Sequence, residues 1–220
     1  MKAAQGALPW LFLLAVCSCY SASLLQEPKP MPPGSIRVAV GAGAGTDALQ
    51  PTLGVRVGVA PRTELRGKLV TDLQTPRGEV GVNVQVVDGE VLDLMLMPSF
   101  FHYDSDDALD EEPGVDLIGF GLPVVLSASL DPVDQYQLFI GPDLRVGKRN
   151  GSAWSALGLH FGAAVSGPND RATFIPECAW LMGVHGRETR DVGASARVLA
   201  QGHGTFECSV GVTFGAKHGP

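Results

Sequence analysis

The chain has 220 residues, of which 45% are hydrophobic and 18% are charged, with 28 glycines and a formal net charge of −7. This length accommodates one sizeable domain together with processing segments, and sparse charge with abundant glycine favours strands and turns over helices. The acidic balance, without a cluster of lysine and arginine, argues against nucleic-acid binding, because phosphates are recognised by a basic surface.

The N-terminal 19 residues have the layout of a bacterial export signal. Lys2 supplies a positive charge, and residues 7–16 form an apolar run that is too short to span a bilayer as a permanent helix. The run ends in Val-Cys-Ser-Cys, which resembles the lipobox of bacterial lipoproteins. Cys19 fits the acylated position better than Cys17, because the small Ser18 precedes it. The alternative is an ordinary signal peptide in which the cysteines are incidental.

A proline-rich segment follows, and the rest of the chain alternates between two kinds of residue. Residues 20–34 contain four prolines, which cannot pair as a strand and predict an extended tether. Beyond them, apolar residues alternate with small or polar ones, and this period of two is typical of strands. The first five predicted strands cover residues 36–42, 53–59, 65–69, 80–86 and 92–103.

The clearest alternation lies in residues 115–148, where a turn at 131–134 separates two long arms of a predicted hairpin. One face of the first arm is uniformly apolar: Ile118, Phe120, Leu122, Val124, Leu126, Ala128 and Leu130. The opposite face is rich in glycine and carries Asp143 and Arg145 deep in the second arm, which suits the narrow lumen of a closed barrel. Three further strands are predicted over residues 156–165, 174–184 and 206–214.

The sequence thus predicts an all-β fold: an up-and-down antiparallel β-barrel of about ten strands, of outer-membrane type, with an N-terminal lipoprotein signal. Connections after even strands are all short, whereas three of the five after odd strands are long, as expected for an outer-membrane barrel. Four prolines inside predicted strands count against this, since each removes a donor from the ladder: Pro98, Pro123, Pro142 and Pro176. The predicted organisation is a signal over 1–19, a tether over 20–34 and a barrel over 35–216.

The lipobox-like start, the proline tether and glycine-rich hairpins such as Leu-Gly-Val-Arg-Val-Gly-Val-Ala-Pro-Arg-Thr-Glu-Leu-Arg-Gly, from Leu53, form a recognisable combination. Together they are similar to the outer-membrane β-barrel-like lipoproteins of Gram-negative bacteria, of the kind found in myxobacteria. The resemblance covers the leader and residues 35–216. It implies a location in the outer membrane and carries no general activity.

Several charged or ionisable residues are predicted to face the lumen, where mixed signs can pair across strands and fill a narrow barrel, so a wide pore is not expected. They include Arg56, Asp143, Arg145, His160, Glu177 and Glu207. Cys178 and Cys208 fall on one apolar face of neighbouring strands. A disulfide and two small buried thiols are equally compatible with that placement.

Other candidate sites have simpler explanations. The acidic run over residues 104–116 lacks the spacing of a calcium loop and is better explained as a solvated loop, so no metal or cofactor is expected. His160 could pair with Ser127, Ser129 or Ser209 as in a lipid-modifying hydrolase, but a packed histidine is favoured because no third group lies at a recognisable spacing.

The function predicted from the sequence is a lipid-anchored protein of the cell outer membrane with a structural or surface-interaction role, exerted through the loops at 104–114 and 186–202. Its expected partner is membrane lipid, contacted through N-terminal acyl chains and the barrel exterior. One alternative is a periplasmic β-barrel whose apolar face points inward to bind a small apolar ligand. The other is a barrel hydrolase acting on lipids, centred on His160.

Overall fold

The computed structural model describes residues 27–44, 49–71, 76–105, 115–167, 171–186 and 204–215. These ranges contain strands β1 Ile36–Ala44, β2 Leu49–Ala60, β3 Thr63–Thr71, β4 Pro76–Asp88, β5 Leu92–Leu96, β6 Ser99–Ser105, β7 Val115–Ser129, β8 Tyr136–Arg149, β9 Ser152–Ser166, β10 Ala172–His185 and β11 Gly204–Phe214. Within them, no helix has the length and apolarity needed to cross a membrane.

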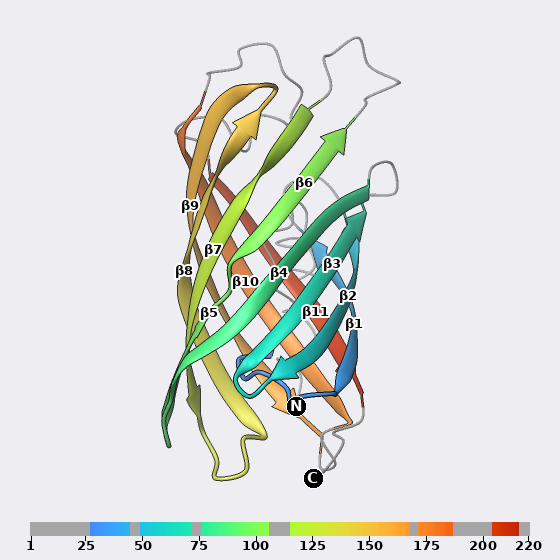
Figure 1. Ribbon diagram of the computed structural model, residues 1–220, viewed down its shortest axis with the longest axis vertical. Coiled ribbons are helices and arrows are strands. Elements are labelled where there is room, and N and C mark those ends of the chain that lie inside the picture. The colour runs from blue at the N-terminus through green and yellow to red at the C-terminus, as the bar shows by residue number, and fades with distance from the viewer. Residues whose placement is uncertain are drawn as a thin grey trace, which may run out of the picture.

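The strands form one closed antiparallel barrel (Figure 1). Strands adjacent in the sequence are mostly adjacent in the sheet, and β1 pairs with β11 to close it. Both β5 and β6 pair with β4 on one side and β7 on the other, so they are two parts of one barrel strand. The described barrel therefore has ten strands, and the predicted fold class is confirmed in its all-β, up-and-down, ten-stranded form.

The prolines in the strands are accommodated by local interruptions of the ladder. Pro98 separates β5 from β6, yet its carbonyl accepts from the Val82 N–H (3.0 Å), and the Met97 N–H donates to the Pro123 carbonyl (2.9 Å). Near Pro142 and Pro176 the pairing skips two residue pairs and resumes in the same register. A closed barrel thus carries these prolines without an edge strand, because the ladder is interrupted only beside each proline and the register of the strands is kept.

The barrel has two different ends, which differ in the length of their connections. At one end, which we call the terminal end, lie short turns such as those at 61–62, 89–91 and 130–135. The two longest intervals between strands follow Ser105 and His185 and belong to the opposite, loop end (Figure 1). Residues 106–114 and 187–203, on which the predicted surface-interaction loops largely fall, lie outside the described residues.

The apolar face of the wall points outward. Phe120 is 63% exposed and Leu144 48%, whereas Arg145 and Glu177 are only 1% and 2% exposed. Successive residues of a strand point to opposite sides of the sheet, so alternation in the sequence becomes an apolar exterior and a polar interior. The alternative of a barrel with its apolar face inward is therefore wrong, because that face covers the outside.

The interior also contains two apolar clusters, which the sequence analysis did not predict. One lies toward the loop end and consists of Phe101, Tyr103, Leu117, Trp154, Ala156 and Leu181. The other consists of Met95, Met97, Val125, Phe139 and Ile175. Phe101 packs edge-on against Trp154, with ring centroids 6.3 Å apart, and the Arg145 guanidinium lies 5.6 Å from the Phe101 centroid. Large side chains thus fill much of the lumen between the charged groups.

Candidate functional site

Residues 27–34 occupy the terminal end of the lumen, and we call them the N-terminal plug (Figure 1). Met31 is 4% exposed. The Gly34 N–H donates to the Gly58 carbonyl of β2 (2.8 Å), and the Gly58 N–H donates back to the Ser35 carbonyl (3.0 Å). This part of the predicted tether is therefore docked rather than free, because its polar groups find partners on the barrel wall. Residues 20–26 lie outside the described residues.

Both charged side chains of the plug are paired with the wall. The Glu27 carboxylate contacts the Arg37 guanidinium and accepts a hydrogen bond from the Thr213 hydroxyl, and it lies 3.7 Å from Arg56 Nη1. Lys29 Nζ lies 3.2 Å from Asp93 Oδ2 and 2.9 Å from Asp134 Oδ2. We call these contacts the latch. It joins the plug to β1, β2, β5, β11 and the turn between β7 and β8.

Glu64 connects the wall to the backbone of the plug. It is fully buried on β3 and accepts two hydrogen bonds from Arg56, at 2.9 Å from Nε and 2.8 Å from Nη2. Its Oε2 also accepts the Met31 N–H (3.1 Å), while Asn83 Nδ2 donates to its Oε1 (2.5 Å). Arg56 Nη2 in turn donates to the Lys29 carbonyl (3.1 Å). A bidentate arginine–carboxylate pair with further donors is the arrangement that tolerates burial of charge.

The ionisable groups of the latch have shifted pKa values. Burial raises the pKa of Glu27, but the charges of Arg56 and Arg37 outweigh it and hold the pKa below its ordinary value of 4.5. Burial lowers the pKa of Lys29, but hydrogen bonds to Asp134 and Asp93 outweigh it and raise the pKa above 10.5. The charged forms of both groups therefore predominate at neutral pH, which stabilises the docked plug.

The plug is expected to hold at neutral pH and to loosen in acid. Because the folded-state pKa of Glu27 lies below 4.5, its contribution is fully present above about pH 4.5 and is lost as the pH falls through the folded-state value. Oxidation of Met31 by hydrogen peroxide, followed by peptide mass spectrometry, should therefore be slow at neutral pH and faster below about pH 4.5. Met95, buried in the interior, should stay protected. A Met31 rate that does not change with acidification, while Met95 remains protected, would contradict this.

A second charged network lies in the middle of the lumen, where four of the predicted lumen residues meet. Asp143 Oδ2 lies 2.6 Å from Arg145 Nε and 3.0 Å from His160 Nε2, and His160 Nδ1 lies 3.1 Å from Glu177 Oε1. Each of these side chains is at most 2% exposed. Both ring nitrogens of His160 face carboxylate oxygens, and only the protonated imidazole donates from both, so the geometry fits two cations balanced by two carboxylates. Glu207 on β11 interacts electrostatically with Arg145.

The predicted lumen residues thus divide between two places. Asp143, Arg145, His160 and Glu177, with Glu207 nearby, form the central network, whereas Arg56 belongs to the latch. A third pairing lies on β3 and β4, where Glu79 is 2.6 Å from Arg66 Nη2 and 3.0 Å from Lys68 Nζ.

The geometry does not fit a hydrolase centred on His160. A serine nucleophile needs an imidazole nitrogen that can accept its proton, and carboxylates engage both nitrogens here. His160 is also buried inside the barrel, away from the lipid-facing side. Among the described residues, no group of three or more His, Cys, Asp or Glu side chains is placed to hold a metal ion.

Cys178 and Cys208 form a disulfide between β10 and β11. They are directly opposite in the register of the two strands, and both are half-buried on the outer face. The bond ties the last strand to its neighbour beside the seam that β11 forms with β1. The predicted lipidation site, Cys19, lies outside the described residues.

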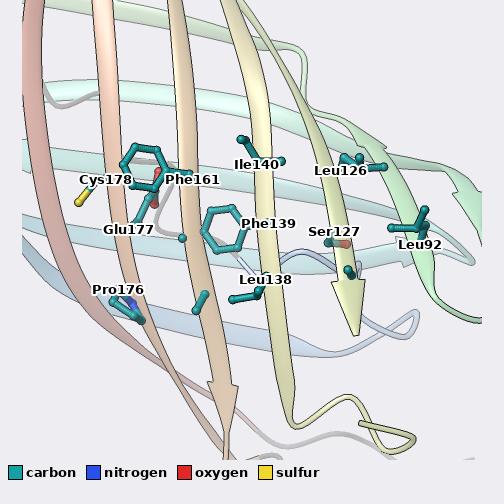
Figure 2. A pocket seen from close by; sticks show the side chains of 13 residues that line it. Leu92, Leu126, Ser127, Leu138, Phe139, Ile140, Phe161, Pro176, Glu177 and Cys178 are labelled. Carbon is teal, nitrogen blue, oxygen red and sulfur yellow. The ribbon is translucent and has the colours of Figure 1, made fainter. Parts of the chain in front are cut away.

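A shallow groove of about 600 Å³ crosses the outer face of β7 to β10 near their terminal ends (Figure 2). Leu126, Leu138, Ile140 and Phe161 line it from outward positions, and it lies where Pro176 interrupts the ladder beside Gly162. Its lining is almost entirely apolar, so it is continuous with the rest of the apolar exterior and suits hydrocarbon rather than a polar ligand.

No protein-family model matches the chain, and no curated protein matches its sequence. Among solved structures, the chain is similar to an outer membrane channel from Pseudomonas putida F1, with 10% identity and a TM-score of 0.51 over 86% of this chain and 99% of that chain. The NanC porin (12% identity, TM-score 0.47, 81% and 98% covered) and Neisserial surface protein A (13%, 0.36, 82% and 94%) are also similar. The first likeness shows that this is the fold of an outer-membrane β-barrel.

Proposed function

We propose that this protein is a lipid-anchored outer-membrane β-barrel with a structural or surface-interaction role. The observation that carries the proposal is the division of the wall, with an apolar exterior and a buried interior of charged and apolar side chains. Large apolar residues along the outer face of the described strands are unfavourable in water and favourable in hydrocarbon. Its partner in this proposal is membrane lipid, bound through the barrel exterior.

The short turns support an orientation with the terminal end in the periplasm, since bacterial barrels have short periplasmic turns and longer external loops. The N-terminal plug then lies on the periplasmic side. Glu27 lies eight positions after Cys19, a reach of at most about 29 Å when extended, so acyl chains on Cys19 can enter the adjacent leaflet. We place the protein, on the same proposal, beside the barrel-like lipoproteins that its leader and hairpins resemble.

The occupied interior favours a structural role over an open pore. Arg145, His160 and Leu117 are among the largest fully buried side chains, and the plug fills part of the terminal mouth. A barrel of ten strands is narrow enough for such side chains to fill it. Surface interaction would be exerted through the loop end.

The proposal is tested on full-length protein purified from detergent-solubilised membranes. We expect intact-mass spectrometry to find acyl chains on the N-terminus created at Cys19, because the lipobox-like motif places that cysteine at the cleavage site. In planar bilayers the same protein is expected to insert without a stable conductance step, because buried side chains and the plug occupy the lumen.

The matched control is the neighbouring cysteine. Cys19→Ser should abolish acylation, whereas Cys17→Ser should leave it intact. Acylation that survives Cys19→Ser would show that another residue is acylated, and a wild-type protein without acyl chains would remove the anchor from the proposal. A reproducible open conductance of the wild-type protein would replace the structural role by a channel.

A further inference from the structure

We infer that the terminal mouth of the barrel is a binding site for an extended peptide that carries a carboxylate and an ammonium group two residues apart. In the structure, the N-terminal plug occupies this site in cis, with Glu27 and Lys29 as the two charged groups. A segment of another protein with the same pattern would compete for it. This inference goes beyond the proposed role and does not depend on acylation of Cys19.

The wall of the mouth offers a separate subsite for each sign of charge. Arg37, Arg56 and the Thr213 hydroxyl surround the plug carboxylate, and these three groups come from β1, β2 and β11. Asp93 and Asp134 receive the ammonium group from β5 and from the turn after β7. Because the two subsites have opposite sign, they fix the direction in which a peptide lies across the mouth.

The wall also recognises the peptide backbone. Arg56 Nη2 donates to the Lys29 carbonyl, and Glu64 accepts the Met31 N–H. The Arg56–Glu64 ion pair of the wall therefore binds a backbone carbonyl and a backbone amide two residues apart. Any extended segment can make these contacts, provided that the residue at the position of Met31 is not proline, because proline has no N–H to donate to Glu64. Proline-rich segments suit this mode, because their backbone is already extended and loses little entropy on binding.

The fit at Gly58 shows how closely the plug approaches the wall. A Cβ at this position would lie 2.1 Å from the Pro32 carbonyl oxygen, so only glycine allows the backbone to approach so closely. On the other side of the plug, a cavity of about 250 Å³ remains between it and the wall. It is lined by Glu27, Lys29, Arg37, Val133, Asp134 and Gln137, among others. One face of the plug thus packs closely against the wall, while the cavity at the other face leaves room for a competing peptide to enter.

The plug is held chiefly by polar contacts, which makes displacement by a competing peptide feasible. Lys29 keeps 29% of its side chain exposed, and one of its partners, Asp134, keeps 42%. An ion pair with this degree of exposure is weak, because water screens it and holding two long side chains in one geometry costs entropy, so the pair of Lys29 with Asp134 can open before the more buried pair of Glu27 with Arg37. A plug held in this way can be exchanged for a competing peptide, whereas a plug held by a large apolar face would stay bound.

The test uses the full chain with the plug weakened by a double substitution, Glu27→Gln with Lys29→Gln, which leaves the wall unchanged. A fluorescent peptide with the sequence Glu-Pro-Lys-Pro-Met-Pro-Pro-Gly is titrated in detergent and its anisotropy is measured. We expect saturable binding to the double variant and binding at least about tenfold weaker to the wild type, because the plug occupies the site for most of the time. The same titration with Asp116→Asn and Lys148→Gln, which alters two exposed charges at the loop end, away from the latch, should match the wild type.

Two controls identify the site. A peptide with the two charges exchanged should not bind the double variant, and adding Arg56→Gln to that variant should abolish binding of the original peptide, because both the carboxylate and a carbonyl contact are lost. Equal binding of both peptides, or equal binding to the wild type and the double variant, would overturn the inference.

A second measurement uses the wild-type chain, so its result does not depend on correct folding of the variant. Excess peptide should accelerate peroxide oxidation of Met31, which is buried only while the plug is docked, and the charge-exchanged peptide should have no effect. Failure of the peptide to change the Met31 rate, together with no binding to the double variant, would show that the plug is a fixed structural element. The acylation and conductance results would stand unaffected.

Discussion

Replacing Asp143 by alanine is expected to destabilise the barrel by about 3–5 kcal/mol, because removing one member of a buried ion pair leaves its partner charged in a poorly solvated interior. Asp143 is fully buried and its Oδ2 serves both Arg145 and His160, so a single substitution takes a carboxylate from two cations. Urea unfolding in lipid vesicles, followed by tryptophan fluorescence, measures the change, since Trp154 lies in the interior.

The control for this prediction is the same substitution at an exposed ion pair. Asp88 lies 3.1 Å from Arg62 Nη2 at the terminal end, and both side chains are about half exposed. Asp88→Ala is therefore expected to change the stability by only about 0–1 kcal/mol. A similar, small effect for both substitutions would mean that the central network is hydrated and does not hold the interior together.

An arginine on the outer wall is expected to destabilise the protein in lipid by about 2–4 kcal/mol when it stands near the bilayer midplane. Leu144 meets this condition, because it lies close to the middle of β8 and pairs with Leu122, at the centre of β7, and with Leu157 of β9. Its side chain is 48% exposed on the outer face. Leu144→Arg should lower the urea midpoint in vesicles, because the guanidinium would replace an apolar side chain in hydrocarbon.

The matched control is Val133→Arg in the turn between β7 and β8. Val133 is 65% exposed at the terminal end, where the cost of a charge falls to about 0–1 kcal/mol. If Leu144→Arg proved as harmless as Val133→Arg in vesicles, the outer face of β8 would not be in contact with hydrocarbon, and the membrane-spanning part of the proposed function would have to be withdrawn.

The wall of the barrel could be predicted from the sequence because its pattern is local. Phe120 and Leu144 occupy the alternate positions that are apolar in their strands, and Arg145 occupies the positions between them. The side of the wall to which each side chain points therefore follows from alternation alone. The predicted number of ten barrel strands is also confirmed despite Pro98, because β5 and β6 on either side of this proline pair with the same neighbouring strands.

The pairing inside the lumen could not be predicted in the same way. His160 is 17 residues from each of its partners, Asp143 and Glu177, and these three side chains come from three different strands. Which inward charges meet depends on the stagger between strands, which the alternation does not specify. The same holds for the inward positions of Phe101 and Trp154, whose contact brings β6 close to β9 across the interior.

The docking of the N-terminal plug was the largest departure from the prediction. Its prolines have the composition of a tether, and nothing local distinguishes a tether that hangs free from one that finds partners. The partners of Glu27 and Lys29 are Arg37, Arg56, Asp93 and Asp134, which are far apart in the sequence. The signal that was available is the placement of one acid and one base two residues apart between the prolines.

By itself, the sequence determined that the chain forms a closed antiparallel wall and which side of that wall is apolar, because side-chain direction in a strand depends only on the parity of the position. Only the tertiary structure decided what the wall encloses. Barrel closure and stagger bring Asp143, Arg145, His160 and Glu177 into one network, and they bring Arg56 and Glu64 to the mouth where the plug is held. These contacts join distant positions in the sequence, so their geometry exists only once the barrel has closed.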